Sequence, residues 1–148
     1  MTTTEAPATL SLLDAFVDTG RAVERALERR LQPLGVGVMQ LRILELTSAR
    51  EMKPTELAPA LVQEVHSVSA MLNRLEDRGL ITRRRDTTDR RSVWVAATPA
   101  GAALAVRAAA MRAEVERQLG AEADLVTYQA LWRCRASVSR GATIGAVK

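Results

Sequence analysis

An arginine-rich segment is the part of this sequence with the clearest chemical potential. Residues 83–91, RRRDTTDRR, contain five arginines and two aspartates, so this stretch alone carries a charge of +3. The whole chain of 148 residues carries +4, which means that most of the excess positive charge is concentrated here. Guanidinium groups bind phosphate oxygens through charge-assisted hydrogen bonds. The segment therefore predicts contact with a polyanion, although a solvated hairpin without a partner is the simpler alternative.

The neighbouring residues place this segment at the tip of a β-ribbon. Residues 80–84 and 92–96 are predicted to be strands, the second because it contains a Val-Trp-Val run. The connecting residues 85–91 are too many for a two-residue turn, so the loop should protrude. A helix predicted over 64–78 precedes the ribbon. A basic β-loop directly behind a short helix is suited to gripping a DNA duplex in two adjacent grooves.

The rest of the chain is predicted to be helical. Hydrophobic residues make up 47% of the sequence but aromatic residues only 3%, so the core must be built from Leu, Val and Ala. Helical spacing, prolines and glycines predict helices over 10–31, 38–49, 54 onward, 99–119 and 122–138. The helix that begins at Pro54 should be short, late-starting or bent, because Pro59 removes a backbone hydrogen bond. The expected fold class is mainly α with a small β-ribbon, a winged helix-turn-helix.

The sequence predicts a single domain over 1–148 in which two kinds of region alternate. Residues 34–98 would form the winged helix-turn-helix head, while residues 1–33 and 99–140 would form long N- and C-terminal dimerisation helices. Residues 141–148 would be a flexible tail. The long helices cannot bury their apolar faces on so small a head, so we expect them to pack against a second copy in a symmetric homodimer.

The helix predicted over 64–78 supplies candidate contacts to bases. Burial of Val68, Met71, Leu72 and Leu75 would leave a polar face exposed. We expect this face to carry His66, Ser67, Ser69, Ala70, Asn73 and Arg74. His66 and Ser69 can donate or accept hydrogen bonds, and Asn73 could pair with an adenine or a phosphate. Arg74 is expected to clamp the DNA backbone or to pair with Glu76 or Asp77.

Several other classes of function are not supported. The chain has one histidine and one cysteine, so no metal site is expected and Cys134 should be a small buried residue without a redox role. We find no nucleophile–base pair, glycine-rich phosphate loop or pair of carboxylates in a plausible cleft, so we expect no catalytic residues and no enzyme. No signal peptide or membrane-spanning stretch is visible. We therefore expect a soluble, cytoplasmic protein without a cofactor.

At this point the sequence resembles the MarR family of bacterial transcription regulators over nearly the whole chain. The resemblance rests on three blocks. These are LGVGVMQLRILEL at 34–46, the helix-turn-helix spacing from ELAPAL to VSAMLNRLEDRGLI at 56–81, and the wing DTTDRR at 86–91 followed by ATPAG at 97–101. The wing of this family usually reads Asp-x-x-Asp-Lys/Arg-Arg, which makes the third block the most specific of the three.

The resemblance implies a role for each wing residue. Arg91 matches the arginine that enters the minor groove, and Asp89 matches the acidic residue that orients it through an ion pair. Arg90 at the tip, together with Arg83, Arg84 and Arg85 along the ribbon, would contact phosphates. A narrow minor groove attracts an inserted arginine because it concentrates negative potential.

The resemblance also implies a regulatory function. The chain would be a homodimeric, ligand-responsive repressor that binds a pseudo-palindromic double-stranded DNA operator. A small anionic or aromatic effector would bind where the head meets the dimerisation helices and would change the spacing of the heads.

The sequence departs from the family pattern near the start of the recognition helix. Val62 occupies a turn position that is often glycine, Glu64 replaces the usual Ser or Thr cap, and Val65 stands where a polar or basic residue is frequent. These departures leave the start of the helix open. They also support an alternative function, a winged-helix protein-interaction module that no longer reads DNA.

Overall fold

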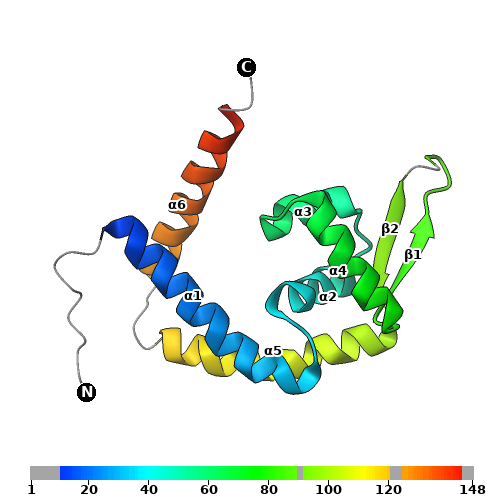
Figure 1. Cartoon of the computed structure of the whole chain (residues 1–148), viewed down its shortest axis with the longest axis horizontal. Coiled ribbons are helices and arrows are strands. Elements are labelled where there is room, and N and C mark those ends of the chain that lie inside the picture. The colour runs from blue at the N-terminus through cyan, green and yellow to red at the C-terminus, as the bar shows by residue number, and fades with distance from the viewer. Residues whose placement is uncertain (1–10, 90–91, 121–124, 145–148) are drawn as a thin grey trace. The chain divides into compact units, whose positions relative to one another are not determined.

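The structure is a computed structural model that describes residues 11–89, 92–120 and 125–144, with only the backbone course for 139–144. Its elements are labelled in Figure 1. The helices are α1 (Leu12–Leu31), a 3-10 turn η1 (Gln32–Leu34), α2 (Val38–Ala49), α3 (Pro54–Leu61), α4 (Val65–Asp77), α5 (Pro99–Gly120) and α6 (Leu125–Ile144). The strands are β1 (Ile81–Arg85) and β2 (Val93–Ala97). The chain divides into two compact units after Arg112. The predicted fold class, mainly α with a small β-ribbon, is confirmed.

The first unit has an aliphatic core between α2, α3, α4 and the β-ribbon. The largest side chains in it are almost completely buried: Leu31, Leu41, Ile43, Leu44, Leu57, Leu61, Val68, Leu72, Leu75, Ile81 and Val95. Complete burial of a side chain of this kind contributes roughly 1.5–3 kcal/mol. This core fixes α4 against α3 and the ribbon, and thereby positions the polar face of α4.

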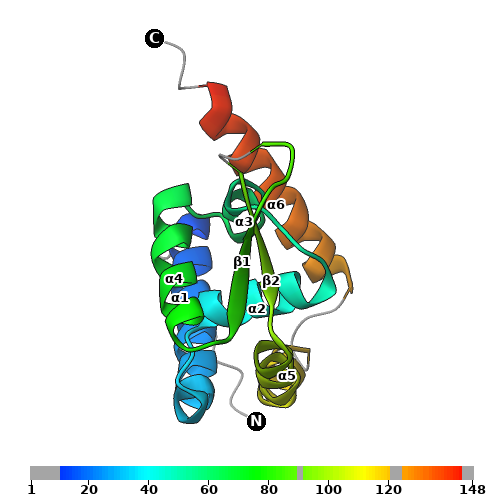
Figure 2. The same ribbon diagram turned by 90° about the vertical axis from the view of Figure 1, so that its right-hand side faces the viewer.

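The β-ribbon is an antiparallel pair that lies beside α4 (Figure 2). Ile81 pairs with Ala97 at one end, and Arg85 pairs with Val93 at the other. Met52, which precedes α3, joins the outer side of β2 through backbone hydrogen bonds to Val95 of 3.0 and 2.9 Å. Both strands begin and end one residue later than the sequence predicts.

The helix boundaries agree with the sequence predictions except at the C-terminus. α2 has the predicted limits, and α3 begins at Pro54 and spans eight residues with Pro59 inside it. α6 continues to Ile144, so residues 141–144 belong to a helix and not to the predicted tail. Residues 145–148 lie outside the described part of the chain.

Two helices expose large apolar side chains. In α1 only Leu27 and Leu31 are buried, whereas Leu13, Phe16 and Val17, which recur at helical spacing, are exposed. In α6 the exposed apolar residues include Val126, Tyr128, Leu131, Trp132 and Val138. Cys134 is also exposed, so the expectation of a buried cysteine is wrong. The described residues of this chain do not bury these apolar side chains.

The junction between the ribbon and α5 depends on close backbone contact. Thr98 donates its hydroxyl to the Gly79 carbonyl at 2.7 Å, and its backbone N–H to the Leu80 carbonyl at 3.0 Å. The Thr98 hydroxyl also accepts from the N–H of Gly101 at 3.1 Å, as an N-cap does. A Cβ atom on Gly101 would lie 2.0 Å from the Leu80 carbonyl oxygen. Position 101 therefore has no room for a side chain.

Gly101→Ala should destabilise the protein by about 2 kcal/mol, because the gain of about 1 kcal/mol in helix propensity is outweighed by the clash with the Leu80 backbone. Urea unfolding at fixed protein concentration measures the difference. Ala109→Gly, at an exposed position of the same helix, reports the propensity term alone. Equal or greater stability of Gly101→Ala would contradict the assigned contact.

Candidate nucleic-acid interface

The turn between α3 and α4 adopts the geometry that glycine normally provides. Val62 has φ 56° and ψ 48°, in the left-handed region, and the residue is 62% exposed. This conformation is strained for a β-branched residue. Gln63 donates its N–H to the Ala58 carbonyl at 2.9 Å, which closes the end of α3. Val62 therefore adopts the backbone conformation of the usual glycine, and the shape of the turn is kept.

The polar face of α4 is exposed as the sequence predicts. The helix begins at Val65 after Glu64, whose side chain forms no cap hydrogen bond. Val68, Leu72 and Leu75 are buried and Met71 is half-buried. His66, Ala70, Asn73 and Arg74 are exposed, and Ser67 and Ser69 are half-buried. The Ser69 hydroxyl donates to the Val65 carbonyl at 2.9 Å, so it presents lone pairs outward.

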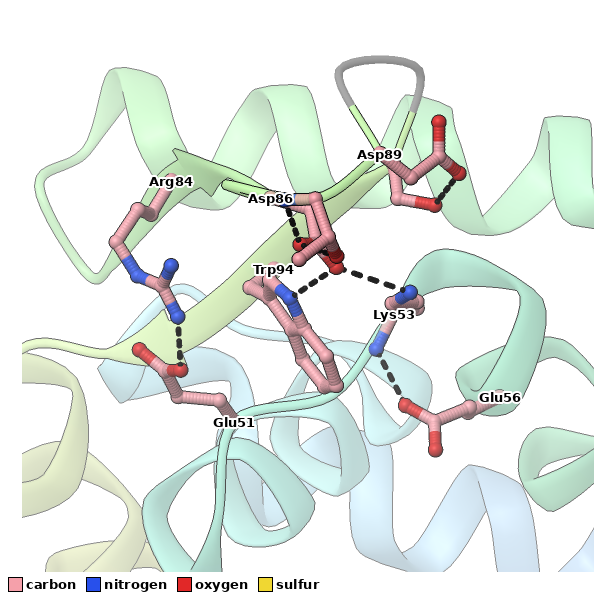
Figure 3. A network of polar contacts seen from close by, with 9 residues as sticks. Glu51, Lys53, Glu56, Arg84, Asp86, Asp89 and Trp94 are labelled. Atoms are coloured by element: carbon pink, nitrogen blue, oxygen red, sulfur yellow. Dashed lines mark hydrogen bonds and ion pairs between the residues drawn. The ribbon is translucent and has the colours of Figure 1, made fainter.

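Two ribbon arginines already bind carboxylates of this chain. Arg83 lies 3.0 Å from a carboxylate oxygen of Glu76 and donates to the Asn73 side-chain oxygen at 2.7 Å. Arg84 donates to Glu51 at 2.7 Å, as Figure 3 shows. Glu76 is thus a partner of Arg83, whereas the sequence suggested Arg74. Arg85, at the end of β1, is exposed.

A carboxylate at the base of the wing joins three segments of the chain (Figure 3). Asp86 accepts from the backbone N–H and hydroxyl of Thr88, both at 2.9 Å, and from the indole N–H of Trp94 at 2.9 Å. The ammonium group of Lys53 lies 3.2 Å from the same carboxylate and 4.7 Å from the centre of the Trp94 ring. The wing is thereby connected to the residue that precedes α3.

These contacts lower the pKa of two acidic groups. The pKa of Asp86 lies far below its ordinary value, chiefly because of the hydrogen bonds from Thr88 and then that from Trp94. The pKa of Glu56 is also lowered, above all by the backbone N–H of Lys53, which donates to it at 2.7 Å. Both carboxylates therefore remain ionised at neutral pH and hold the start of α3 and the wing in place.

The described part of the wing loop closes through Asp89. The Ser92 hydroxyl donates to the Asp89 carboxylate at 2.7 Å, and the Ser92 N–H donates to the Asp89 carbonyl at 2.9 Å. Asp86 donates its N–H to the Ser92 carbonyl at 2.9 Å. Arg90 and Arg91, the predicted tip and minor-groove residues, lie outside the described residues.

Sequence reasoning did not identify Glu51, Lys53 and Trp94 as parts of this site. Trp94 was predicted only as part of a strand. Glu51 and Arg84 are 33 positions apart in the sequence, so no local pattern connects them. The one available signal was the excess of arginines, which requires acidic partners if the ribbon is to pack against the head.

The described residues show no group of three or more side chains suited to binding a metal ion. None of the helices in this part of the chain has the length and apolar character needed to cross a membrane.

Comparisons with known proteins agree with this architecture. A model of the MarR family matches residues 34–92. The multiple antibiotic resistance protein MarR of Salmonella typhimurium is 31% identical over 104 residues, which cover 65% of this chain and 72% of that protein. The transcriptional regulator BldR of Sulfolobus solfataricus has a similar structure, with a TM-score of 0.76, 25% identity and coverage of 87% and 93% of the two chains. A mutant MarR from E. coli complexed with operator DNA has the same fold, with a TM-score of 0.68, 23% identity and coverage of 87% and 99%.

Asp86→Asn should lower the melting temperature at pH 7 by several degrees, because the neutral amide loses its ion pair with Lys53 and a strong acceptor. The carboxylate form is favoured by folding, so its stabilisation is complete above the ordinary aspartate pKa of about 3.9 and is lost as the pH falls below that value. The melting temperature should therefore fall less steeply between pH 7 and pH 3 in the variant than in the wild-type protein.

The matched control is Asp77→Asn, which changes an exposed aspartate outside this network. A wild-type and an Asp86→Asn protein with parallel pH profiles would show that the Asp86 contacts do not contribute to stability.

Proposed function

Because this chain belongs to the MarR family of transcriptional regulators, which are not enzymes, we propose that it is a homodimeric, ligand-responsive repressor that binds a pseudo-palindromic operator. The recognition helix α4 would enter the major groove, and the arginine wing would reach the adjacent minor groove. An α-helix has the diameter that the major groove admits. Repression requires only that the bound dimer compete with other proteins for the same DNA.

One observation carries the DNA-binding proposal: a polar helix face stands next to a basic ribbon whose base is fixed. α4 exposes His66, Asn73 and Arg74 on a helix whose other face buries Val68, Leu72 and Leu75. Asp86 holds the wing to Lys53 and Trp94, so the loop that follows has a defined origin. The structural similarity to a MarR protein complexed with operator DNA supports the same use of this face.

The wing residues have separate proposed roles. Arg91 would insert into the minor groove with Asp89 as the orienting carboxylate, and Arg90 would contact a phosphate. Arg85 is exposed and suited to a phosphate. Arg84 would reach DNA only by exchanging its bond to Glu51, a pair whose side chains are 54% and 46% exposed. Such an exposed pair contributes little to stability, so breaking it requires little free energy.

The proposed DNA binding has a measurable salt dependence. With about six phosphate contacts, the affinity for a duplex enriched from a random-sequence pool should fall roughly a thousandfold between 50 and 200 mM salt. Arg91→Ala should weaken binding at both salt concentrations and lose minor-groove protection in a footprint. Fluorescence anisotropy and footprinting measure these effects, and Arg29→Ala on α1 removes the same charge far from the wing in sequence. Equal protection by Arg91→Ala would refute its insertion.

A protein-interaction module is the second candidate, and the start of α4 favours it. Val62 and Val65 are 62% and 43% exposed, and Glu64 lies between them in sequence, exposed as well. An apolar and acidic patch at the helix end suits a protein better than a phosphate. This function would give weak DNA binding without steep salt dependence and without a footprint, so the same measurements separate the two candidates.

The homodimer is proposed from the apolar faces of α1 and α6. Leu12 and Leu13 are 76% and 70% exposed, and Tyr128 and Trp132 are 63% and 56% exposed. Helices with such faces require a partner surface. Residues 1–33 and 99–140 would supply it from each copy, around the head of residues 34–98.

Sedimentation tests this assembly. The wild-type protein should sediment as a dimer at micromolar concentration, and Leu131→Glu with Trp132→Glu should shift it toward the monomer, because two charges would be buried without partners. Thr82→Glu, at an exposed position of the head, should leave the dimer unchanged. A monomeric wild-type protein would overturn the proposal.

A cavity of about 330 Å³ is the proposed effector site. It is lined by Pro33, Leu34, Arg78, Leu80, Ala100, Ala103, Leu104 and Arg107. Arg78 donates to the Leu34 carbonyl at 3.2 Å, which fixes one guanidinium at the cavity wall. Two guanidinium groups beside proline, leucine and alanine side chains suit a small aromatic anion. Calorimetric titration with benzoate tests this, and equal binding by wild type and Arg107→Ala would contradict it.

A further inference from the structure

One arginine of the ribbon binds two side chains of the recognition helix. Arg83 extends one guanidinium nitrogen to Glu76, at 3.0 Å, and the other to Asn73, at 2.7 Å. Asn73 and Glu76 are three positions apart on α4, so they lie on neighbouring turns of one helix face. Arg83 is opposite Val95 in the β-ribbon, and its side chain is only 27% exposed. The guanidinium is therefore fixed from both sides.

This contact determines which way the Asn73 amide faces. A guanidinium group has five donors and no acceptor, so only the carbonyl oxygen of Asn73 can bind it. The NH₂ group must then lie on the other branch of the amide, away from Arg83. A charged donor on the oxygen also polarises the amide, which strengthens the N–H groups as donors. Asn73 is exposed, so this donor is accessible from solvent.

We propose that Arg83 is a positioning residue that holds Asn73 as a hydrogen-bond donor toward DNA. The inference rests on the proposed function and deepens it. The partner of Asn73 is then an acceptor: a phosphate oxygen, O6 or N7 of guanine, N7 of adenine, or O4 of thymine. Two-point pairing with adenine would instead require the Asn73 oxygen to accept from the adenine amino group while it is bound to Arg83. The sequence alone left both adenine and a phosphate open as partners.

A comparison of variants tests the link between the two residues. The probe is a fluorescein-labelled duplex enriched from a random-sequence pool by the wild-type protein, with affinity measured by anisotropy. Asn73→Ala should weaken binding about three- to tenfold, as expected for one hydrogen bond. In an Arg83→Gln background the same change should weaken binding less than about twofold, because Gln can donate or accept and no longer dictates the amide orientation.

Two further variants separate positioning from general damage. Arg83→Lys keeps a group that only donates, so the effect of Asn73→Ala should be largely restored. Ser69→Ala should have the same effect in every background, since Ser69 bonds to Val65 and not to Arg83. Thermal melting confirms that each variant folds. An effect of Asn73→Ala that is equal in the Arg83 and Gln backgrounds would overturn the proposal.

Binding measured on two different DNA duplexes identifies the acceptor. If Asn73→Ala weakens binding equally on the enriched duplex and on a scrambled one, the acceptor is a phosphate. If it weakens binding only on the enriched duplex, the acceptor is a base. Replacement of an adenine by purine without its 6-amino group should leave the Asn73 contribution unchanged. If this replacement weakens wild-type but not Asn73→Ala binding, the oxygen accepts from adenine and the proposal fails. Enrichment of no duplex would overturn the proposed function itself and this inference with it.

Discussion

The ion pair between Lys53 and Asp86 is the contact on which the arrangement of this head depends. Lys53 precedes α3 and Asp86 follows β1, so their 3.2 Å contact connects the helix-turn-helix to the wing. Trp94 completes the connection, because its ring lies beside the ammonium group and its N–H binds the carboxylate. The aliphatic core is closely packed and aligns the helices. The described part of the wing loop is mostly exposed, so the directional bonds to Asp86 restrict it instead.

Charge within the ribbon is compensated before any DNA is bound. The segment 83–91 has a sequence charge of +3, yet Arg83 and Arg84 are paired with Glu76 and Glu51. Phosphates approaching these arginines must compete with carboxylates that are already in place. The two pairs differ, because Arg84 is about half exposed and Arg83 is about one quarter exposed. Arg84 can be exchanged readily, whereas Arg83 is better described as part of the scaffold. Counting arginines in the sequence therefore overstates the number of phosphate contacts.

Local chemistry made much of this fold predictable. Prolines at 54 and 99 mark helix starts, Gly79 marks a helix end, and the strands were placed within one residue because β-branched and aromatic residues favour extended backbone. The outward face of α4 followed from its spacing. Contacts between distant segments were not predictable, since Glu51, Lys53 and Asn73 carry no local signal of their partners. The exposed apolar residues of α1 agree with the prediction that the head cannot bury this helix, but helical spacing cannot say which surface covers them.

The structure thus separates two kinds of interaction by location. Directional and charged contacts set the geometry of α4 and the ribbon, whereas α1 and α6 expose large apolar side chains among the described residues. Salt screens exposed ion pairs such as Arg84–Glu51, but it does not weaken apolar burial. Raising the salt concentration therefore acts twice on the proposed DNA face, since it weakens both phosphate contacts and the internal pairs that compete with them. The second effect partly offsets the first, because an arginine released from its carboxylate is more available to a phosphate. The measured salt dependence consequently reports the difference between the phosphate contacts and the internal ion pairs. Arg83 is better buried than Arg84, so Arg83 contributes less to this salt dependence.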